Sequence, residues 1–165
     1  MIRHVCIAFA LALASCGPEP GSDGGVPGDA PPVEASLELG EGEAVFRPIA
    51  SGDVLLIARG CQGSQHVWVG LRTRGLVARG ATIRLDLLDA TTRARVSLEL
   101  YVRLSLDDIG DGTSELLGIT LQVPMPDEVL ERDLILRGEV TDSASATATA
   151  EVPVRVAWGT EICGG

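Results

Sequence analysis

The chain has 165 residues, and its 23 acidic and 13 basic residues give a formal net charge of −10. A surface this acidic disfavours nucleic acid, because phosphates need neutralisation by lysine or arginine. All 13 basic residues are arginines, so chemistry that needs a lysine, such as a Schiff base or a P-loop, is excluded. Hydrophobic residues make up 45 % of the chain, which is typical of a globular protein.

The first residues have the layout of a secretory signal peptide. Arg3 and His4 form a short basic start, and an apolar run from Val5 to Ser15 ends in small residues. This run is too short for a membrane-spanning helix, which needs ~20 residues. We therefore expect residues 1–15 to be removed from the mature protein, and the loss of Arg3 would change the net charge from −10 to −11.

The end of this segment, Leu13-Ala14-Ser15-Cys16, resembles the lipobox of bacterial lipoproteins. The resemblance implies that Cys16 becomes the first residue and carries a diacylglycerol on its thiol and an acyl chain such as palmitate on its amine. Two or more chains hold a protein firmly on a bilayer. Gly17 follows the cysteine, and in the enteric sorting rule this implies delivery to the outer membrane. The alternative is an ordinary signal peptide with a cysteine near its end.

Residues 16–34 form the predicted anchor and linker. The stretch Gly17 to Val33 contains five glycines and five prolines, and its apolar residues are two valines and one alanine. Such a segment buries too little apolar area to offset the entropy of ordering it. We expect it to hold the folded part, residues 35–165, away from the membrane.

The folded part alternates between apolar and polar residues. Along Val96–Leu106 every even position is aliphatic, and the same period of two marks Thr82–Leu87, Ile119–Met125 and the long run Ala144–Trp158. Side chains of a strand point alternately to opposite faces, so each run predicts a strand with one buried face. Pro153 predicts an edge or a bulge, because proline cannot donate to a ladder. The predicted strands are 36–39, 43–47, 53–58, 66–73, 81–88, 94–106, 117–123, 133–141 and 145–157.

These strands predict an all-β fold. Short strands separated by Gly, Asp and Pro favour an antiparallel β-sandwich of about eight or nine strands, immunoglobulin-like or fibronectin-like. A small closed β-barrel is the alternative, because alternation does not distinguish two packed sheets from one rolled sheet.

The four cysteines separate by position. Cys6 would leave with the signal peptide and Cys16 would carry lipid, so Cys61 and Cys163 remain for an oxidising compartment. Two such thiols predict one structural disulfide, which on the chain-entropy account contributes roughly 4–5 kcal/mol by closing a loop of about 100 residues. A redox-active or metal-binding thiol pair is the alternative, although the short CxxC spacing that lowers a thiol pKa is missing.

Candidates for chemistry are few. His66 is the one histidine left after the signal, so a metal centre with two histidine ligands is excluded, and a hydrolase around His66 is the catalytic alternative. The run Asp107–Glu115 invites a calcium-dependent adhesion module, although Ile109 breaks the EF-hand spacing. Asp86 and Asp89, or Glu99, could form a carboxylate pair, but solvated strand faces explain these acids better. We expect no catalytic residue, metal or cofactor.

The body also resembles uncharacterised envelope lipoproteins of GC-rich Gram-negative bacteria. The resemblance lies in the stretches GEAVFRPIASGDVLLIARGCQGSQHVWVGLRTRGL, residues 42–76, and EVTDSASATATAEVPVRV, residues 139–156. It implies a secreted β-sandwich. We therefore expect a non-catalytic envelope protein, structural or protein-recognising, whose exposed edge strands add to an envelope protein partner. An outward face bearing Arg72, Arg95 and Arg103 could contact acidic groups.

Overall fold

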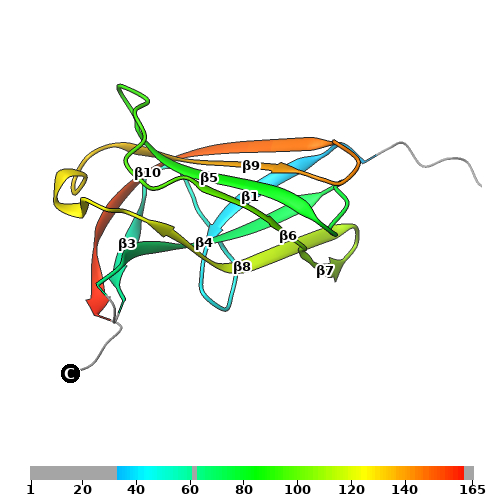
Figure 1. Cartoon of the computed structure of the whole chain (residues 1–165), viewed down its shortest axis with the longest axis horizontal. Helices are drawn as coiled ribbons and strands as arrows, with labels where there is room; N and C mark the ends of the chain where they lie inside the picture. Colours follow the sequence, from blue (N-terminus) through cyan, green and yellow to red (C-terminus); the bar gives the residue numbers. More distant parts are fainter. Residues whose placement is uncertain (1–32, 61–62, 162–165) are drawn as a thin grey trace, which may run out of the picture. The chain divides into compact units, whose positions relative to one another are not determined.

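The computed structural model describes residues 33–60 and 63–161. This part of the chain contains ten strands and one short 3₁₀ turn (Figure 1). Within it, no helix has the length and apolar character needed to cross a membrane. The elements are β1 (Ser36–Glu41), β2 (Arg47–Pro48), β3 (Asp53–Arg59), β4 (Gln65–Arg74), β5 (Ala81–Asp89), β6 (Leu100–Leu104), β7 (Asp107–Gly110), β8 (Thr113–Gln122), η1 (Pro126–Glu128), β9 (Leu134–Thr141) and β10 (Thr147–Glu161).

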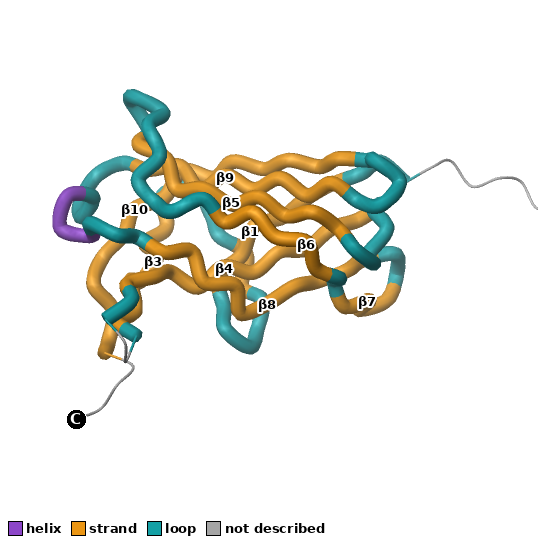
Figure 2. The backbone as a smooth tube through the Cα atoms, in the orientation of Figure 1, coloured by secondary structure: helices purple, strands orange, loops and turns teal. Residues whose placement is uncertain are grey.

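The strands hydrogen-bond into one mixed sheet that curls as a half-barrel around its buried side. Its main path is β2-β1-β4-β3-β10-β9-β5-β6, and β8 pairs with β4 on one side and β7 on the other. η1 and β7 lie at opposite ends of the strands (Figure 2). The all-β prediction is confirmed. An immunoglobulin-like sandwich is not confirmed, because the strands form one continuous sheet, and the sheet is not a closed barrel, because β6 pairs with β5 alone.

One strand pair corrects the expectation of a wholly antiparallel sheet. β3 and β10 run parallel, with Val156 opposite Leu55 and Trp158 opposite Ile57. β3 also pairs with β4 at Arg59 and its neighbour, so it lies between β4 and β10 and keeps these two strands apart. The prediction was wrong because alternation reports which face of a strand is buried and not the direction of its neighbour.

The core is built from the alternating positions that the sequence marks. The inward side chains of the central strands are almost completely buried: Leu55, Ile57, Val67, Val69, Leu71, Ile83, Leu85, Leu87, Leu121, Leu134, Leu136, Val154 and Val156. Each such side chain contributes ~1.5–3 kcal/mol through its removal from water. Gly138 lies on the same inward side, and a Cβ there would come within 2.7 Å of the Leu39 side chain. The core of the curled sheet therefore includes a close contact between β1 and β9.

Pro153 takes the position that its chemistry allows. β10 pairs with β9 along Thr147–Val154, but it pairs with β3 only from Val154 onward. At Pro153 one edge of β10 is thus without a strand partner, as predicted for a residue that has no N–H to donate.

Three predicted elements differ from the structure in kind or in extent. The strand expected at 43–47 shrinks to β2, because the chain turns at Gly42, whose φ of +138° favours glycine. The strand expected at 94–106 is regular only over β6. The turn expected from Asp107 includes β7, which pairs with the start of β8.

Asp142 organises the β9–β10 turn and ties it to a distant loop. Its carboxylate accepts hydrogen bonds from the N–H groups of Val77 at 2.8 Å, Ala144 at 2.8 Å and Ala146 at 2.9 Å. The bond from Val77, supported by those from Ala146 and Ala144 and opposed by desolvation, lowers the Asp142 pKa from its ordinary value of 3.8. Because the folded form binds this proton more weakly than the unfolded form, the contribution to stability is present above 3.8. It is lost as the pH falls through that value toward the folded pKa.

Asp142→Asn removes this titration. We expect the mutant to unfold at a lower urea concentration than the parent at neutral pH. As the pH falls from about 5 to about 3, its midpoint should drop less steeply than that of the parent. Urea unfolding followed by circular dichroism measures both, with Asp127→Asn at an exposed position of η1 as the control. Equal slopes for Asp142→Asn and the parent would show that Asp142 does not carry this pH dependence.

Candidate interaction site

The predicted lipidation and disulfide residues lie outside the described residues. This applies to Cys16, Cys61 and Cys163. In the sequence, Cys61 and Cys163 come shortly after the ends of two neighbouring strands. Arg59 of β3 and Glu161 of β10 are partners in the parallel ladder, and each precedes its cysteine by two positions.

His66 is buried at the start of β4 and packs against Trp68. The two rings meet edge to face, with centroids 5.0 Å apart and planes at 89°. The backbone of His66 pairs with Ala58 on one side and Gln122 on the other. This is the geometry of a side chain that packs beside an aromatic ring.

The acidic run from Asp107 forms the β7–β8 hairpin. Asp107, Asp108 and Asp111 are exposed, and the Asp108 carboxylate accepts a hydrogen bond from the Gly110 N–H at 2.9 Å, as turn-forming aspartates do. Glu115 pairs instead with Arg72 across the sheet, at 2.6 Å. Among residues 33–60 and 63–161, no three His, Cys, Asp or Glu side chains gather in a way that could hold a metal ion.

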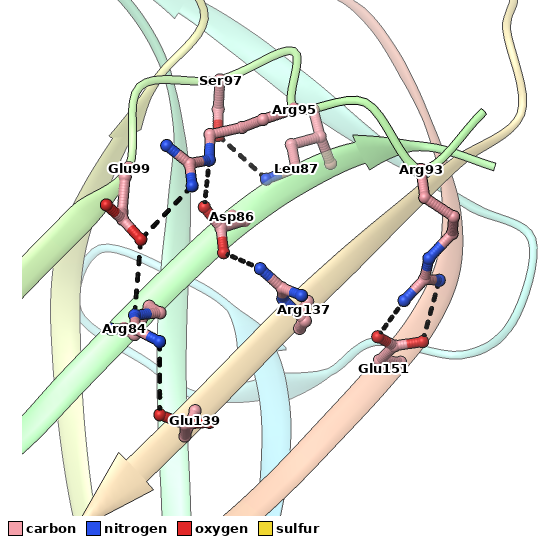
Figure 3. Close-up of polar contacts among 10 residues, drawn as sticks. All are labelled: Arg84, Asp86, Leu87, Arg93, Arg95, Ser97, Glu99, Arg137, Glu139 and Glu151. Atoms are coloured by element: carbon pink, nitrogen blue, oxygen red, sulfur yellow. Dashed lines mark hydrogen bonds and ion pairs between the residues drawn. The ribbon is translucent and has the colours of Figure 1, made fainter.

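A buried carboxylate lies at the centre of a polar network over β5 and β9 (Figure 3). Asp86 is 0 % exposed although its position in β5 faces away from the core. One of its oxygens lies 2.7 Å from the Arg95 Nε, and the other accepts a hydrogen bond from the Arg137 Nη2 at 2.5 Å. A carboxylate that is excluded from solvent needs cationic partners of this kind, because burial of an unpaired charge costs several kcal/mol.

The network extends to Glu99, immediately before β6. The Glu99 carboxylate lies 3.3 Å from the Arg84 Nε and 3.4 Å from the Arg95 Nη2, and Arg84 also faces Glu139 at 3.7 Å. Arg93 adds a two-pronged pair with Glu151 of β10. Four arginines thus face four carboxylates, and their formal charges cancel. The expectation that Arg72 and Arg95 contact external acids is not favoured, because both already pair with acids of this chain.

These contacts hold the segment between β5 and β6 against the sheet. The backbone N–H of Leu87 donates to the Ser97 Oγ at 2.9 Å, and the N–H groups of Val96 and Ser97 both approach the Leu87 oxygen. Two donors at one acceptor indicate a bulge, so the chain leaves regular pairing here. At Leu98 the N–H instead donates to the Gln122 oxygen at the end of β8.

β6 begins two residues later and forms the last strand of the sheet. The Leu87 oxygen and the Asp89 N–H both form bonds on the β6 side of β5. The backbone N–H and C=O groups of the odd residues of β5 therefore point toward β6. The opposed pairs Leu85–Leu100 and Ile83–Val102 are therefore hydrogen-bonded. It follows that the N–H and C=O groups of Tyr101 and Arg103 point to the free edge.

The apolar face of β6 is incompletely buried. Leu98 and Leu104 are 52 % and 40 % exposed, whereas Ile83 and Leu85 on the neighbouring β5 are 0 % exposed. The same segment alternates regularly in the sequence, a pattern that predicts burial of every even residue. The sequence thus specifies a buried face that the single chain does not fully cover.

Side chains on the outward face of β6 are ordered by the network. The Arg84 guanidinium lies 5.3 Å from the ring centre of Tyr101, which is 64 % exposed, and the Arg103 Nε donates to the Gly80 oxygen at 3.0 Å. Between the start of β6 and the end of β8 lies an open hollow of about 230 Å³. Its walls are Leu98–Leu100 and Thr120–Gln122. Free backbone groups, exposed leucines and an aromatic ring therefore occur together along one strand, and such a strand edge can accept another strand.

Sequence reasoning missed the network, and it expected exposed edge strands as a binding site without identifying β6. It assigned Asp86 and Glu99 to solvated faces, although the density of alternating charges from Arg84 to Glu99 was a signal of mutual pairing. Comparison with protein-family models and with curated proteins finds no match to this chain.

The double substitution Arg95→Gln and Arg137→Gln leaves the buried Asp86 carboxylate without a cation. We expect it to lower the free energy of unfolding by ~3–5 kcal/mol, because an unpaired buried charge is costly. Adding Asp86→Asn should recover part of this loss, since a neutral amide needs no cation. Urea unfolding at neutral pH measures the free energy of unfolding of the parent, the double mutant and the triple mutant. Arg93→Gln, which breaks an exposed pair, is the control and should change this free energy much less than the double substitution does. A double mutant as stable as the parent, or no recovery with Asp86→Asn, would contradict this account.

Proposed function

We propose that this protein is a lipid-anchored, non-catalytic protein of the cell envelope that recognises other proteins by strand addition at the free edge of β6. The observation that carries the proposal is the β6 edge. Its backbone groups at Tyr101 and Arg103 have no strand partner within the described residues, and its apolar face is partly exposed. An added strand satisfies such groups through main-chain bonds and buries alternate side chains, which is how strand-adding domains bind.

The proposed anchor is lipidated Cys16. Its support is the lipobox-like Leu13-Ala14-Ser15-Cys16 and the Pro/Gly-rich linker that follows it. A flexible linker of this length spans roughly 20–25 Å on average, enough to let the sheet meet proteins at the membrane surface. Gly17 favours the outer membrane as the site of anchoring.

We also propose a disulfide between Cys61 and Cys163. Its support is the pairing of Arg59 with Glu161 on parallel strands, because each of these residues precedes its cysteine by two positions. The Arg59 guanidinium lies 4.2 Å from the ring centre of Trp158, so this end of β3 is packed against β10. The bond would fasten the parallel pair where it ends.

The mass of the protein purified from envelope membranes tests both covalent proposals. We expect a chain that begins at Cys16, carries the mass of a diacylglycerol and an acyl group, and is lighter by two hydrogens than the same chain after reduction. Cys16→Ser is the control, and it should lack the lipid mass and leave the membrane fraction. An unmodified N-terminus would contradict the anchor, and an unchanged mass on reduction would contradict the disulfide.

Photo-crosslinking in cells tests the proposed recognition site. A photoreactive phenylalanine analogue replaces Tyr101 on the β6 edge or, as control, Leu56, which is 55 % exposed on the interior strand β3. We expect a crosslinked protein product from position 101 and none from position 56. In the position 101 background, Arg103→Pro should abolish the product, because it removes an edge N–H while the bonds to β5 remain. Arg103→Ala should retain it.

A product from position 101 that survives Arg103→Pro would mean that β6 contacts proteins without strand addition. No product from position 101, or equal products from both positions, would contradict the proposal.

A further inference from the structure

We infer that the free edge of β6 binds the same edge of a second copy of this chain, antiparallel about a two-fold axis through Tyr101. This inference rests on the proposed use of that edge in protein recognition and names the partner. A two-fold contact uses the same surface on both copies, so the strand must be complementary to itself.

The segment from Glu99 to Arg103, ELYVR, has this complementarity. Antiparallel pairing about Tyr101 places Leu100 opposite Val102 of the second copy, whereas Leu98 lies outside the pairing because its N–H already donates to the Gln122 oxygen of β8. It also places Glu99 opposite Arg103, twice, and brings the two Tyr101 rings together on the outward face. Opposite charges and aromatic or aliphatic pairs directly across a ladder are stabilising.

The direction of the backbone groups agrees with this axis. Tyr101 and Arg103 present their N–H and C=O groups at the free edge, so an axis through Tyr101 lets its N–H donate to the Tyr101 oxygen of the other copy and the reverse. If the axis is moved to Leu100 or Val102, residues with outward-pointing N–H and C=O groups still lie opposite one another. Glu99 and Arg103, however, are then no longer opposed. Charge complementarity therefore selects Tyr101.

The charges within each copy leave Arg103 suited to this contact. Its Nε donates to the Gly80 carbonyl, and no acid pairs with it among the contacts of the described chain. Glu99 is held at the start of β6 by Arg84 and Arg95, so its carboxylate is positioned in advance. The second copy supplies a third cation to Glu99 and an acid to Arg103.

The contact also adds cover at Leu104. This side chain is 40 % exposed and follows Arg103, whose partner in this register is Glu99 of the second copy. A single short strand buries less than the ~1,600 Å² of a standard interface, so the pairing is weak between free molecules. Tethering on one membrane raises the local concentration of the second copy and favours the pairing there.

A cysteine on the axis tests the inference in the intact, membrane-bound protein. Residues opposed in a hydrogen-bonded pair have Cα atoms ~5.5 Å apart, within the range of a disulfide. In Tyr101→Cys the new cysteines of two copies therefore lie opposite each other. We expect a disulfide-linked dimer on a non-reducing gel of the membranes, well above the amount in the parent chain, and its loss on reduction.

Arg103→Cys is the matched control on the same edge. In the proposed register its cysteines are displaced by four residues, or ~13 Å, so no linked dimer is expected. The double substitution Glu99→Cys and Arg103→Cys brings opposed cysteines together again and should restore the dimer. Circular dichroism of each purified variant establishes that the sheet is retained.

The outcomes separate the partner from the proposed function. Equal linkage from Tyr101→Cys and Arg103→Cys, or none from Tyr101→Cys in a folded protein, would overturn the two-fold pairing. If photo-crosslinking from position 101 then labels a different protein, the second copy is excluded and recognition at the β6 edge stands. If it labels nothing, both proposals fail.

Discussion

A sheet that curls without closing must end in strands whose outer backbone groups have no partner, and this constraint governs the rest of the structure. On one side β3 joins β4 to β10 and carries the sheet around the core. On the other side β6 and β8 approach each other at the bond from the Leu98 N–H to the Gln122 oxygen and are not paired as strands beyond it. Unpaired edges are usually blunted by charge, proline or a covering loop, because they bind other strands. β6 carries one arginine, and its apolar face is partly open.

The polar side chains around β6 serve to place that edge. Asp86 is buried because Arg95 arrives from the β5–β6 connection and Arg137 from β9, and neither guanidinium would stay there without the carboxylate. The connection is thereby held on the sheet, and Glu99 enters β6 in a defined position. Such a network does not need to add much net stability, since buried ion pairs often only recover their desolvation cost. Its contribution is geometric, because it sets where β6 begins.

Much of the fold could be predicted from the sequence, because burial on one face of a strand leaves a period of two. The inward residues of β4, β5 and β9 follow directly from the alternation, and the strands expected at 53–58, 66–73, 81–88 and 133–141 differ from β3, β4, β5 and β9 by at most one residue at either end. The parallel pair of β3 and β10 could not be predicted, because strand direction depends on long-range pairing. The burial of Asp86 was missed for a related reason: its partners come from positions 95 and 137, and sequence spacing does not bring them together.

At the β6 edge the sequence pattern and the observed burial differ. The alternation along Val96–Leu106 predicted a buried face, and the structure leaves Leu98 and Leu104 exposed. At Leu98 the difference has a local cause, since the bulge at Val96 and Ser97 ends regular pairing before this residue. It also has a wider meaning, because residues patterned for burial but exposed in one chain mark a surface that another chain can cover.

The most direct test of this account is amide hydrogen exchange along β6 in a dilute solution of the protein, where the copies are separated. The account predicts an alternation in which the amides of Leu100 and Val102, bonded to β5, exchange slowly, while those of Tyr101 and Arg103 exchange quickly. Slow exchange at all four amides in the separated chain would contradict it, because the edge of β6 would then be covered from within the molecule.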